Sequence, residues 1–278
     1  MLHQDICRYF HLWRKTMYKT YYGLSGEPFG KSETNLYQSA QFKESLSRLE
    51  YMKKARGLML ITGDAGVGKS TLIRAFKESL KENSYKVIYL PLTTVNKADF
   101  YRQLNSELGG EKQSRKFEMF KSIQKLLVNH DKNLKQTPII IFDDAQYLNS
   151  DNLFELHLLL NFEIDSYDPA LWILTGQPHL RERISRPAFA SIEQRIVLKS
   201  TLMPLSEIET KEYIEHHLKL KGRKEPIFNE SGYLAVFKAS NGVKRVINRI
   251  AMQSIMLGVS KKLEIINEEA VFQATQSL

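Results

Sequence analysis

The chain has 278 residues, 42% of them hydrophobic, so it can bury a core in one large domain or in two modest ones. Its 40 lysines and arginines outnumber its 31 acidic residues, and the net charge of +9, spread along the chain, predicts a polyanionic partner: nucleic acid first, an acidic membrane surface second. Cys7 is the only cysteine, which excludes an internal disulfide framework and a cysteine-based zinc site.

Residues 1–16 are predicted to form an N-terminal extension in front of the first domain. His, Arg and Lys interrupt them too often for a signal-peptide core, and no stretch of the sequence reaches the roughly 18 apolar residues of a membrane span. We therefore expect a cytoplasmic protein without a membrane span. An aromatic-rich helix that docks on a partner is an alternative interpretation of the extension.

Apolar runs rich in β-branched residues alternate with helical periods over residues 17–204, which is typical of a parallel sheet covered by helices on both faces. The runs predict strands at 58–62, 86–91, 138–142, 170–175 and 195–199. Capping residues predict helices between them, from Ser39 to about Arg56, from Asn96 to Gly109 and Gly110, and from Ser150 to Ile164. This part of the chain is expected to be an α/β domain.

After Pro204 the pattern changes, because strand-like runs give way to helical periods alone. These periods predict helices at about 206–221, 229–239, 242–258 and 267–276. Residues 205–278 are therefore predicted to form a separate, all-helical domain.

The segment GDAGVGKS satisfies the pattern G-x-x-x-x-G-K-[ST] and stands between a predicted strand and a predicted helix, the context that this motif requires. Its glycines allow the backbone to curl so that N–H groups face a nucleotide's phosphates, and the helix that follows adds a partial positive charge. A glycine-rich turn that binds nothing is the alternative, which the flanking strand and helix disfavour. The residues expected to bind ATP are Gly63, Asp64, Ala65, Gly66, Val67, Gly68, Lys69, Ser70 and Thr71.

Mg²⁺ is the metal that this motif implies. Lys69 would reach the β- and γ-phosphates, and Ser70 would ligate the Mg²⁺. A P-loop also needs a carboxylate on a neighbouring strand, and the run PIIIF ends in Asp143, which would hold the metal, and Asp144, which would polarise the attacking water. The alternative is an acidic turn after a strand. Because Asp144 is one methylene shorter than the Glu usual at this place, we expect slow hydrolysis.

Further motifs accompany the P-loop, namely YYGLSGEPFG at 21–30, FDDAQYL at 142–148, ILTGQPHLRERI at 173–184, IEQRI at 192–196 and SNGVKRVINRIA at 240–251. Together they resemble the ExeA-like (general secretion pathway A-like) AAA+ ATPases, a family that also includes helper ATPases of transposons. The resemblance spans about residues 18–257. It implies an α/β fold, an AAA+ P-loop NTPase core with a parallel sheet, followed by a small all-helical lid, and oligomers in which neighbouring subunits share an ATP site.

Within this resemblance, Thr175 matches the sensor-one position, a polar group that orients the attacking water, although a plain strand-end threonine is the alternative. Arg195 in IEQRI is similar to the arginine finger that neutralises γ-phosphate charge in the adjacent protomer. Its rivals for that role are Arg181, Arg183 and Arg186.

Arg245 resembles the sensor-two arginine that closes the helical domain onto the nucleotide. Lys244 and Arg249 in the same motif are interpreted instead as the surface side of that helix. Phe29 matches a segment that lies over the adenine in related folds, with a place in the core as the other interpretation. The departure from the family is Asp144, which puts brisk turnover in doubt but leaves nucleotide binding untouched.

The resemblance implies two classes of function for the same ATPase. In the first, the chain regulates DNA transposition, with double-stranded DNA bound without sequence preference, a transposase as partner and a homo-oligomer as the active form. In the second, it is a secretion-type ATPase. Because secretion-type members usually add a membrane span and a periplasmic region, which this sequence lacks, and because the charge is +9, we expect transposition.

The sequence also allows two weaker hypotheses. A small-molecule P-loop kinase is disfavoured by the helical domain that carries NGVKR. The segment EKQSRKFEMFKSIQKLL at 111–127 carries five cations, which we interpret as the solvated face of an amphipathic helix in preference to a DNA-tracking face.

Overall fold

The computed structural model describes residues 17–30, 34–91 and 94–276, so the expected extension at 1–16 lies outside the described residues. The chain divides into two compact units. Residues Ala40–Met203 form one, which we call the α/β unit. The described residues before Ala40 together with those after Met203 form the other, the helical unit.

The α/β unit is built on a five-stranded sheet whose paired strands all run parallel, in the order β2-β3-β4-β1-β5. The strands are β1 (Gly57–Gly63), β2 (Tyr85–Leu90), β3 (Thr137–Phe142), β4 (Leu171–Gly176) and β5 (Ile196–Leu202). Each of the five predicted strands is therefore confirmed, within a few residues at its ends. The central strands β1 and β4 are buried along their whole length, which explains why their sequences are apolar without alternation.

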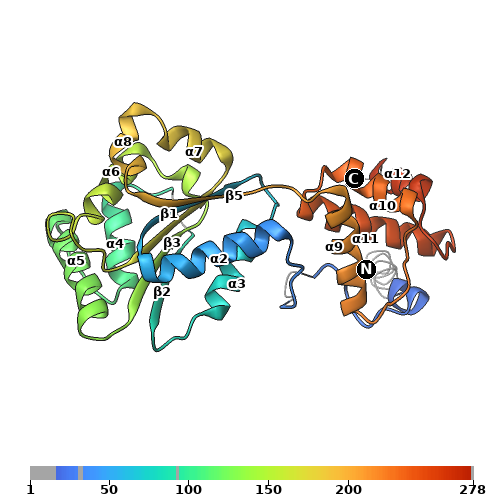
Figure 1. Cartoon of the computed structure of the whole chain (residues 1–278), viewed down its shortest axis with the longest axis horizontal. Helices are drawn as coiled ribbons and strands as arrows, with labels where there is room; N and C mark the ends of the chain where they lie inside the picture. The colour runs from blue at the N-terminus through green and yellow to red at the C-terminus, as the bar shows by residue number, and fades with distance from the viewer. Residues whose placement is uncertain (1–16, 31–33, 92–93, 277–278) are drawn as a thin grey trace, which may run out of the picture. The chain divides into compact units, whose positions relative to one another are not determined.

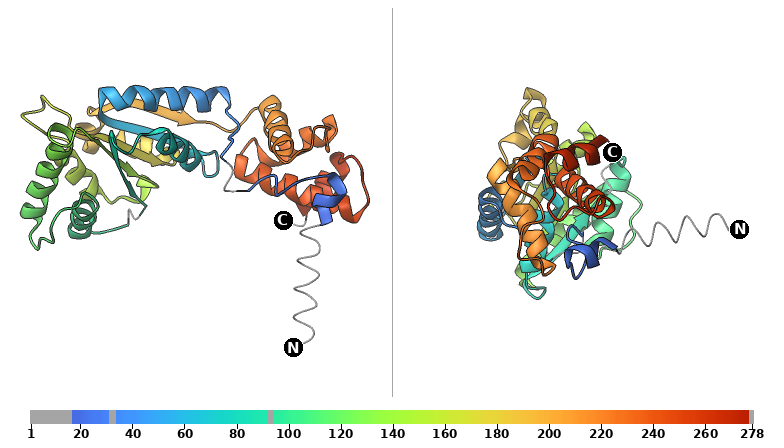
Figure 2. Two further views of the ribbon diagram at one scale, coloured as in Figure 1. Left: turned by 90° about the horizontal axis from the view of Figure 1, so that it is seen from below. Right: turned by 90° about the vertical axis from the view of Figure 1, so that its right-hand side faces the viewer.

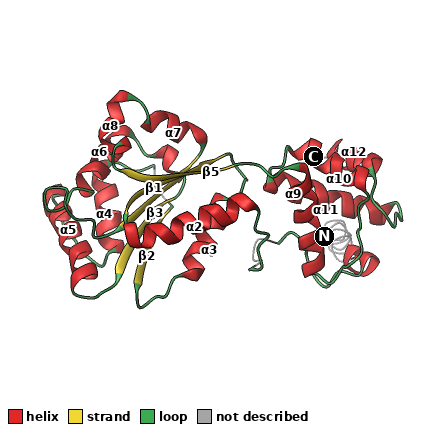
Figure 3. Cartoon of the chain, in the orientation of Figure 1, coloured by secondary structure: helices red, strands yellow, loops and turns green. Residues whose placement is uncertain are grey.

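Helices cover both faces of the sheet. On one face lie α2 (Ala40–Ala55) and α3 (Lys69–Ser79), as Figures 1 and 3 show. The opposite face is covered by α4 (Lys97–Glu107), α5 (Lys116–Lys132) and α6 (Ser150–Leu159).

 

The helix α6 spans Ser150–Leu159, and its neighbours α7 (Pro178–Ile184), α8 (Ala190–Glu193) and the short turns η1 (Ala145–Tyr147) and η2 (Pro187–Phe189) complete this side of the unit. Figure 2 shows the sheet with α2 (blue) on one side and α5 (green) on the other. One large apolar cluster joins the sheet to α4, α5 and α6, with Trp172 and Phe142 stacked at its centre. The α/β fold that the sequence predicts is thus confirmed.

Helix α6 differs from its prediction because it ends at Leu159 and does not reach Ile164. The backbone turns left-handed at three successive residues, Glu163, Ile164 and Asp165, with φ of 47°, 57° and 64°. Left-handed backbone ends a right-handed helix and costs roughly 1–2 kcal/mol per residue for side chains with a Cβ. The helical periodicity of the sequence therefore runs past the true end of the helix.

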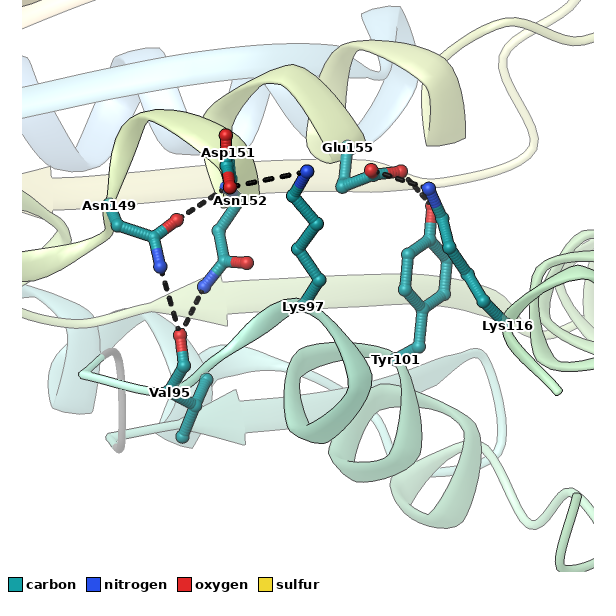
Figure 4. Close-up of polar contacts among 8 residues, drawn as sticks. All are labelled: Val95, Lys97, Tyr101, Lys116, Asn149, Asp151, Asn152 and Glu155. Carbon is teal, nitrogen blue, oxygen red and sulfur yellow. Dashed lines mark hydrogen bonds and ion pairs between the residues drawn. The ribbon is translucent and has the colours of Figure 1, made fainter. Parts of the chain in front are cut away.

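Polar contacts fasten the start of α6 to the segment that precedes α4 (Figure 4). Asn149 caps α6 by accepting a hydrogen bond from the backbone N–H of Asn152, at 2.7 Å. The side-chain amides of Asn149 and Asn152 both donate to the carbonyl of Val95, at 3.2 and 2.7 Å. The segments that follow β2 and β3 are thereby held together.

A second contact in Figure 4 uses one of the cations of the 111–127 segment. Glu155 on α6 is 5% exposed, and its carboxylate accepts a hydrogen bond from Tyr101 at 2.7 Å and pairs with Lys116 at 2.5 Å. Burial, and after it this hydrogen bond, raises the pKa of Tyr101. Lys116 is therefore engaged within the unit.

The helical unit contains α9 (Glu207–Leu220), α10 (Glu230–Ser240), α11 (Lys244–Ser260) and α12 (Glu268–Gln276), close to the four predicted helices. Residues 17–39, which the sequence assigns to the α/β domain, belong to this unit instead. The reason is burial: Tyr18, Tyr22 and Phe29 lie in its apolar core, and Tyr22 donates a hydrogen bond to the carbonyl of Leu263 at 2.8 Å. Among the described helices, none combines the length and the apolar character that crossing a bilayer requires.

Candidate functional site

The segment between β1 and α3 forms the expected phosphate-binding loop. Strand β1 ends at Gly63, and α3 begins at Lys69 with Gly68 as its N-cap. Gly66 and Gly68 have φ of 89° and 115°, the left-handed region that glycine adopts without strain. The loop therefore curls back on itself and delivers the chain to a helix N-terminus, where backbone N–H groups and the helix dipole favour an anion.

Lys69 closes this loop from inside. Its side chain is largely buried, and its ammonium donates to the carbonyls of Gly63 and Asp64, at 2.8 and 3.0 Å. A buried ammonium is stabilised by such acceptors, which fix the cation over the loop. Asp64, Ala65 and Ser70 are exposed around it, as residues that face a ligand from solvent would be.

Asp143 follows β3 and lies beside the loop. Ser70 donates to its Oδ2 at 3.3 Å, and the backbone N–H of Asp144 donates to its Oδ1 at 3.0 Å. The hydroxyl of Thr175, at the end of β4 and wholly buried, also donates to Oδ1. The structure thus brings together three residues that the sequence singles out, Ser70, Asp143 and Thr175, from three different elements.

Tyr89 on β2 is a member of this cluster that the sequence did not indicate. Its hydroxyl donates to Asp143 Oδ2 at 2.7 Å. Burial, and after it this hydrogen bond, raises the pKa of Tyr89, so the group stays a donor at neutral pH. Its position could be found only from the pairing of β2 with β3, which sets Tyr89 beside Ile141, two residues before Asp143.

Asp144 itself has left-handed backbone, with φ of 50° and ψ of 41°. Its Oδ1 accepts a hydrogen bond from the side chain of Gln146 at 3.0 Å. Gln146 is a second residue that the sequence did not single out, although it belongs to the quoted run FDDAQYL. Its proximity to Asp144 along the chain is the signal that was available.

Arg195 lies just before β5, and the P-loop lies just after β1. Because β1 and β5 are parallel, with Leu58 beside Ile196 and Gly63 beside Leu202, Arg195 and the P-loop lie at opposite ends of these strands. The two ends of β5 are six residue steps apart, which at about 3.3 Å per residue is about 20 Å and beyond the reach of an arginine side chain. Within its own subunit, Arg195 does not approach the P-loop.

Local partners hold Arg195 in place. It forms an ion pair with Asp165, and its Nη1 donates to the carbonyl of Leu160 at 3.3 Å. Its Nε donates to Nδ1 of His157 at 3.2 Å. Burial, and then the charge of Arg195, lowers the pKa of His157, which keeps that ring neutral and able to accept.

The rival arginines Arg181, Arg183 and Arg186 follow β4, at the same end of the parallel strands as the P-loop. Arg183 on α7 donates to the carbonyl of Leu148 at 2.6 Å, so it is committed to the fold, whereas Arg181 and Arg186 are exposed. Arg245 and Lys244 stand at the start of α11 in the helical unit. Phe29 packs in the core of that unit, 5.5 Å between ring centres from His217.

The loop and its carboxylate fit ATP and Mg²⁺. A Cβ on Gly63 would come within 2.5 Å of the Leu202 carbonyl, so the start of the cradle depends on a residue without a side chain. In the described part of the chain there is no cluster of three or more His, Cys, Asp or Glu residues that would hold a metal by itself. Ser70 and Asp143 are instead a set of two oxygen donors. Two donors suit Mg²⁺, which usually takes one or two protein ligands and completes its shell with phosphates and water.

Comparison with known proteins gives one family match and one curated relative. Residues 52–184 match the family described as AAA domain. The general secretion pathway protein A of Aeromonas hydrophila is 28% identical over 250 residues, which cover 88% of this chain and 45% of that protein. The chain therefore spans less than half the length of this curated relative. The resemblance to ExeA-like AAA+ ATPases is confirmed by these two matches.

Solved structures share the fold. Cdc6p from Pyrobaculum aerophilum has a TM-score of 0.67 at 15% identity, over 90% of this chain and 70% of that one. The RuvB Holliday junction branch migration motor of Thermotoga maritima has a TM-score of 0.58 at 20% identity, over 91% and 74%. The ORC2 protein of Aeropyrum pernix, described in ADPNP and ADP complexes, has a TM-score of 0.63 at 14% identity, over 90% and 71%. The AAA+ P-loop fold predicted from the sequence is thus confirmed.

Proposed function

We propose that this chain, an ExeA-like AAA+ P-loop protein, binds and hydrolyses ATP with Mg²⁺. The observation that carries the proposal is the contact between loop and carboxylate: Ser70 Oγ lies 3.3 Å from Asp143 Oδ2, beside a buried Lys69. Two oxygen ligands on neighbouring elements and a cation at a helix N-terminus are the parts that phosphoryl transfer needs.

Each residue has a distinct part in this proposal. The backbone of residues 63–71 and Lys69 would hold the phosphates, and Ser70 and Asp143 would hold the Mg²⁺, which supplies charge neutralisation when bound. Asp144 would accept the proton of the attacking water. Thr175 fixes the carboxylate of Asp143 through its hydroxyl, a role we add to its expected place near the water.

The proposal extends to an oligomer with shared ATP sites. Arg195 cannot reach the phosphates of its own subunit, so an action on a γ-phosphate requires a second copy. Its ion pair with Asp165 would then be exchanged for the phosphate of the neighbour. The sensor-two role of Arg245 is part of the same proposal.

A matched set of variants tests the ATPase and its assembly. Lys69→Ala should lose ATP binding in calorimetry, because the direct cation at the β- and γ-phosphates is gone. Arg195→Ala should keep binding but lose ATP-stimulated assembly and turnover, while Arg102→Ala, which removes an exposed arginine with its own ion pair to Asp99 on α4, serves as control. Wild-type affinity in Lys69→Ala would refute the nucleotide site, and full turnover in Arg195→Ala would refute the shared site.

For the partner, we propose that the ATP-bound oligomer binds double-stranded DNA and acts with a transposase in DNA transposition, in the cytoplasm. The net charge of +9 supports a polyanion, and lysines and arginines distributed along the chain suit phosphates more than base edges. Binding should be nearly independent of sequence and should weaken steeply with salt. An electrophoretic shift assay with ADP and with a non-hydrolysable ATP analogue, at two salt concentrations, measures this.

The second candidate is a secretion-pathway ATPase. It is favoured by the 28% identity with general secretion pathway protein A over most of this chain. The two candidates share the nucleotide site and differ in the partner. Absence of DNA binding in every nucleotide state would refute the transposition proposal and favour this one.

A further inference from the structure

The side chain of Gln146 joins two parts of the site. It lies in the turn η1, directly after β3 and Asp144, and is 6% exposed. Its Nε2 donates to Asp144 Oδ1 at 3.0 Å, and its Oε1 accepts the backbone N–H of Gln177 at 3.1 Å. A single amide therefore links a carboxylate to the N-cap of α7, and an amide is the side-chain group that both donates and accepts in this way.

The close approach depends on Gly176, which separates Thr175 from Gln177. A Cβ built on Gly176 would lie 2.8 Å from Gln146 Oε1 and 2.6 Å from Leu180 Cδ2. Those distances are shorter than van der Waals contact, so any larger residue would push the amide away. The strand end of β4 is thus shaped to admit the side chain of Gln146.

A second contact ties α7 to the same segment. Arg183 donates to the carbonyls of Leu148 and Gln146, at 2.6 and 3.4 Å. The far end of the segment is held at Val95 through Asn149, at 3.2 Å. Since both Gln177 and Arg183 belong to α7 or its cap, a displacement of α7 pulls on the segment that carries Asp144.

We propose that Gln146 is a positioning residue for ATP hydrolysis: it fixes the carboxylate of Asp144 and couples its orientation to α7. The inference rests on the proposed ATPase function. Asp144 has left-handed backbone next to Asp143 and lies between β3 and the turn η1. The bond from Gln146 orients Oδ1 of this carboxylate, and the bond to Gln177 fixes the amide of Gln146 in turn.

The test uses two variants and one control. Gln146→Met keeps the length of the side chain and removes both hydrogen bonds, whereas Gln146→Glu keeps the acceptor and loses the donor. Gln124→Met is the control, because the Gln124 side chain makes a hydrogen bond of its own, to the carbonyl of Asn161 at 3.1 Å, and plays no part in the site. We expect Gln146→Met to lower kcat about tenfold to a hundredfold, with the Kd for Mg·ATP within threefold of wild type.

Two readouts separate positioning from a structural role. Hydrogen exchange at the Gln177 amide should become faster in Gln146→Met, with or without nucleotide, and stay unchanged in Gln124→Met. Gln146→Glu keeps the acceptor for the Gln177 N–H and loses the donor to Asp144, so exchange at the Gln177 amide should stay close to wild type while kcat falls.

The outcomes are distinct for the inference and for the proposed function. A wild-type chain that binds ATP but never hydrolyses it would refute the proposed ATPase function. Hydrogen exchange at the Gln177 amide would still report on its bond to Gln146. Turnover of Gln146→Met equal to that of Gln124→Met would overturn the inference alone. So would a kcat for Gln146→Glu equal to that of wild type.

Discussion

Replacing Thr175 by valine removes one hydroxyl from the cluster around Asp143 and keeps the shape of the side chain. Thr175 is 0% exposed, and its hydroxyl donates to Asp143 Oδ1. A hydrogen bond to a charged group contributes about 2 kcal/mol, and the additional buried methyl returns about 0.8 kcal/mol. We therefore expect the free energy of unfolding to fall by about 1 kcal/mol.

The matched variant is Thr175→Ser, which keeps the hydroxyl and loses a buried methyl, again at about 1 kcal/mol. The two variants should thus be equally destabilised but differ in turnover. If the hydroxyl fixes Asp143 for the metal, Thr175→Val should lower kcat about tenfold or more, and Thr175→Ser should stay within about threefold of wild type.

Urea denaturation measures the stability term. A Trp13→Phe background leaves Trp172 on β4 as the single tryptophan, so its fluorescence reports on the α/β unit. With a slope of about 2 kcal/mol per M, a loss of about 1 kcal/mol moves the midpoint by about 0.5 M. Equal turnover in the two variants, at equal midpoints, would refute the reasoning that Thr175 acts through its hydroxyl.

Two further predictions concern other carboxylates and one buried amine. Asp144→Asn should bind ATP normally in calorimetry, and its rate of hydrolysis in a phosphate-release assay should fall about a hundredfold. Asp143→Ala should also weaken Mg²⁺-dependent binding. Wild-type turnover in Asp144→Asn would point to another base. Burial lowers the pKa of Lys244 from 10.5 to about 8, so between these values the unfolded chain binds more protons and stability rises with pH. Relative to Lys244→Met, wild type should gain about 2 kcal/mol in urea denaturation from pH 7.5 to 9.5, and parallel pH curves for the two proteins would contradict the burial of this amine.

Much of the fold could be predicted because its signals are local. The inner strands β1, β3 and β4 are buried on both faces, so each one appears as an apolar run such as PIIIF. Helix starts were found where a side chain caps the backbone, as Asn96 does by accepting from the N–H of Asp99 at 2.9 Å. The P-loop could be predicted from spacing because the phosphate cradle is made by one continuous segment.

The remaining features depend on contacts between distant parts of the sequence. Residues 17–39 join the helical unit because Tyr18 and Tyr22 find their apolar partners there, more than 180 residues further along the chain. The contact of Tyr89 with Asp143 follows from the register of two strands, which no local pattern specifies. The bond from Gln146 to Gln177 likewise requires the two strand ends to lie together.

The division of the chain into units also affects how it is made. The α/β unit is inserted into the helical unit, and its two ends meet where the backbone N–H of Met203 donates to the side chain of Gln41 at 3.0 Å. During synthesis the α/β unit can fold as soon as Met203 has left the ribosome, since N-terminal parts emerge first. Tyr18 and Tyr22 can be buried only after α11 and its neighbours have been synthesised. Until then they are exposed apolar side chains that a chaperone can bind.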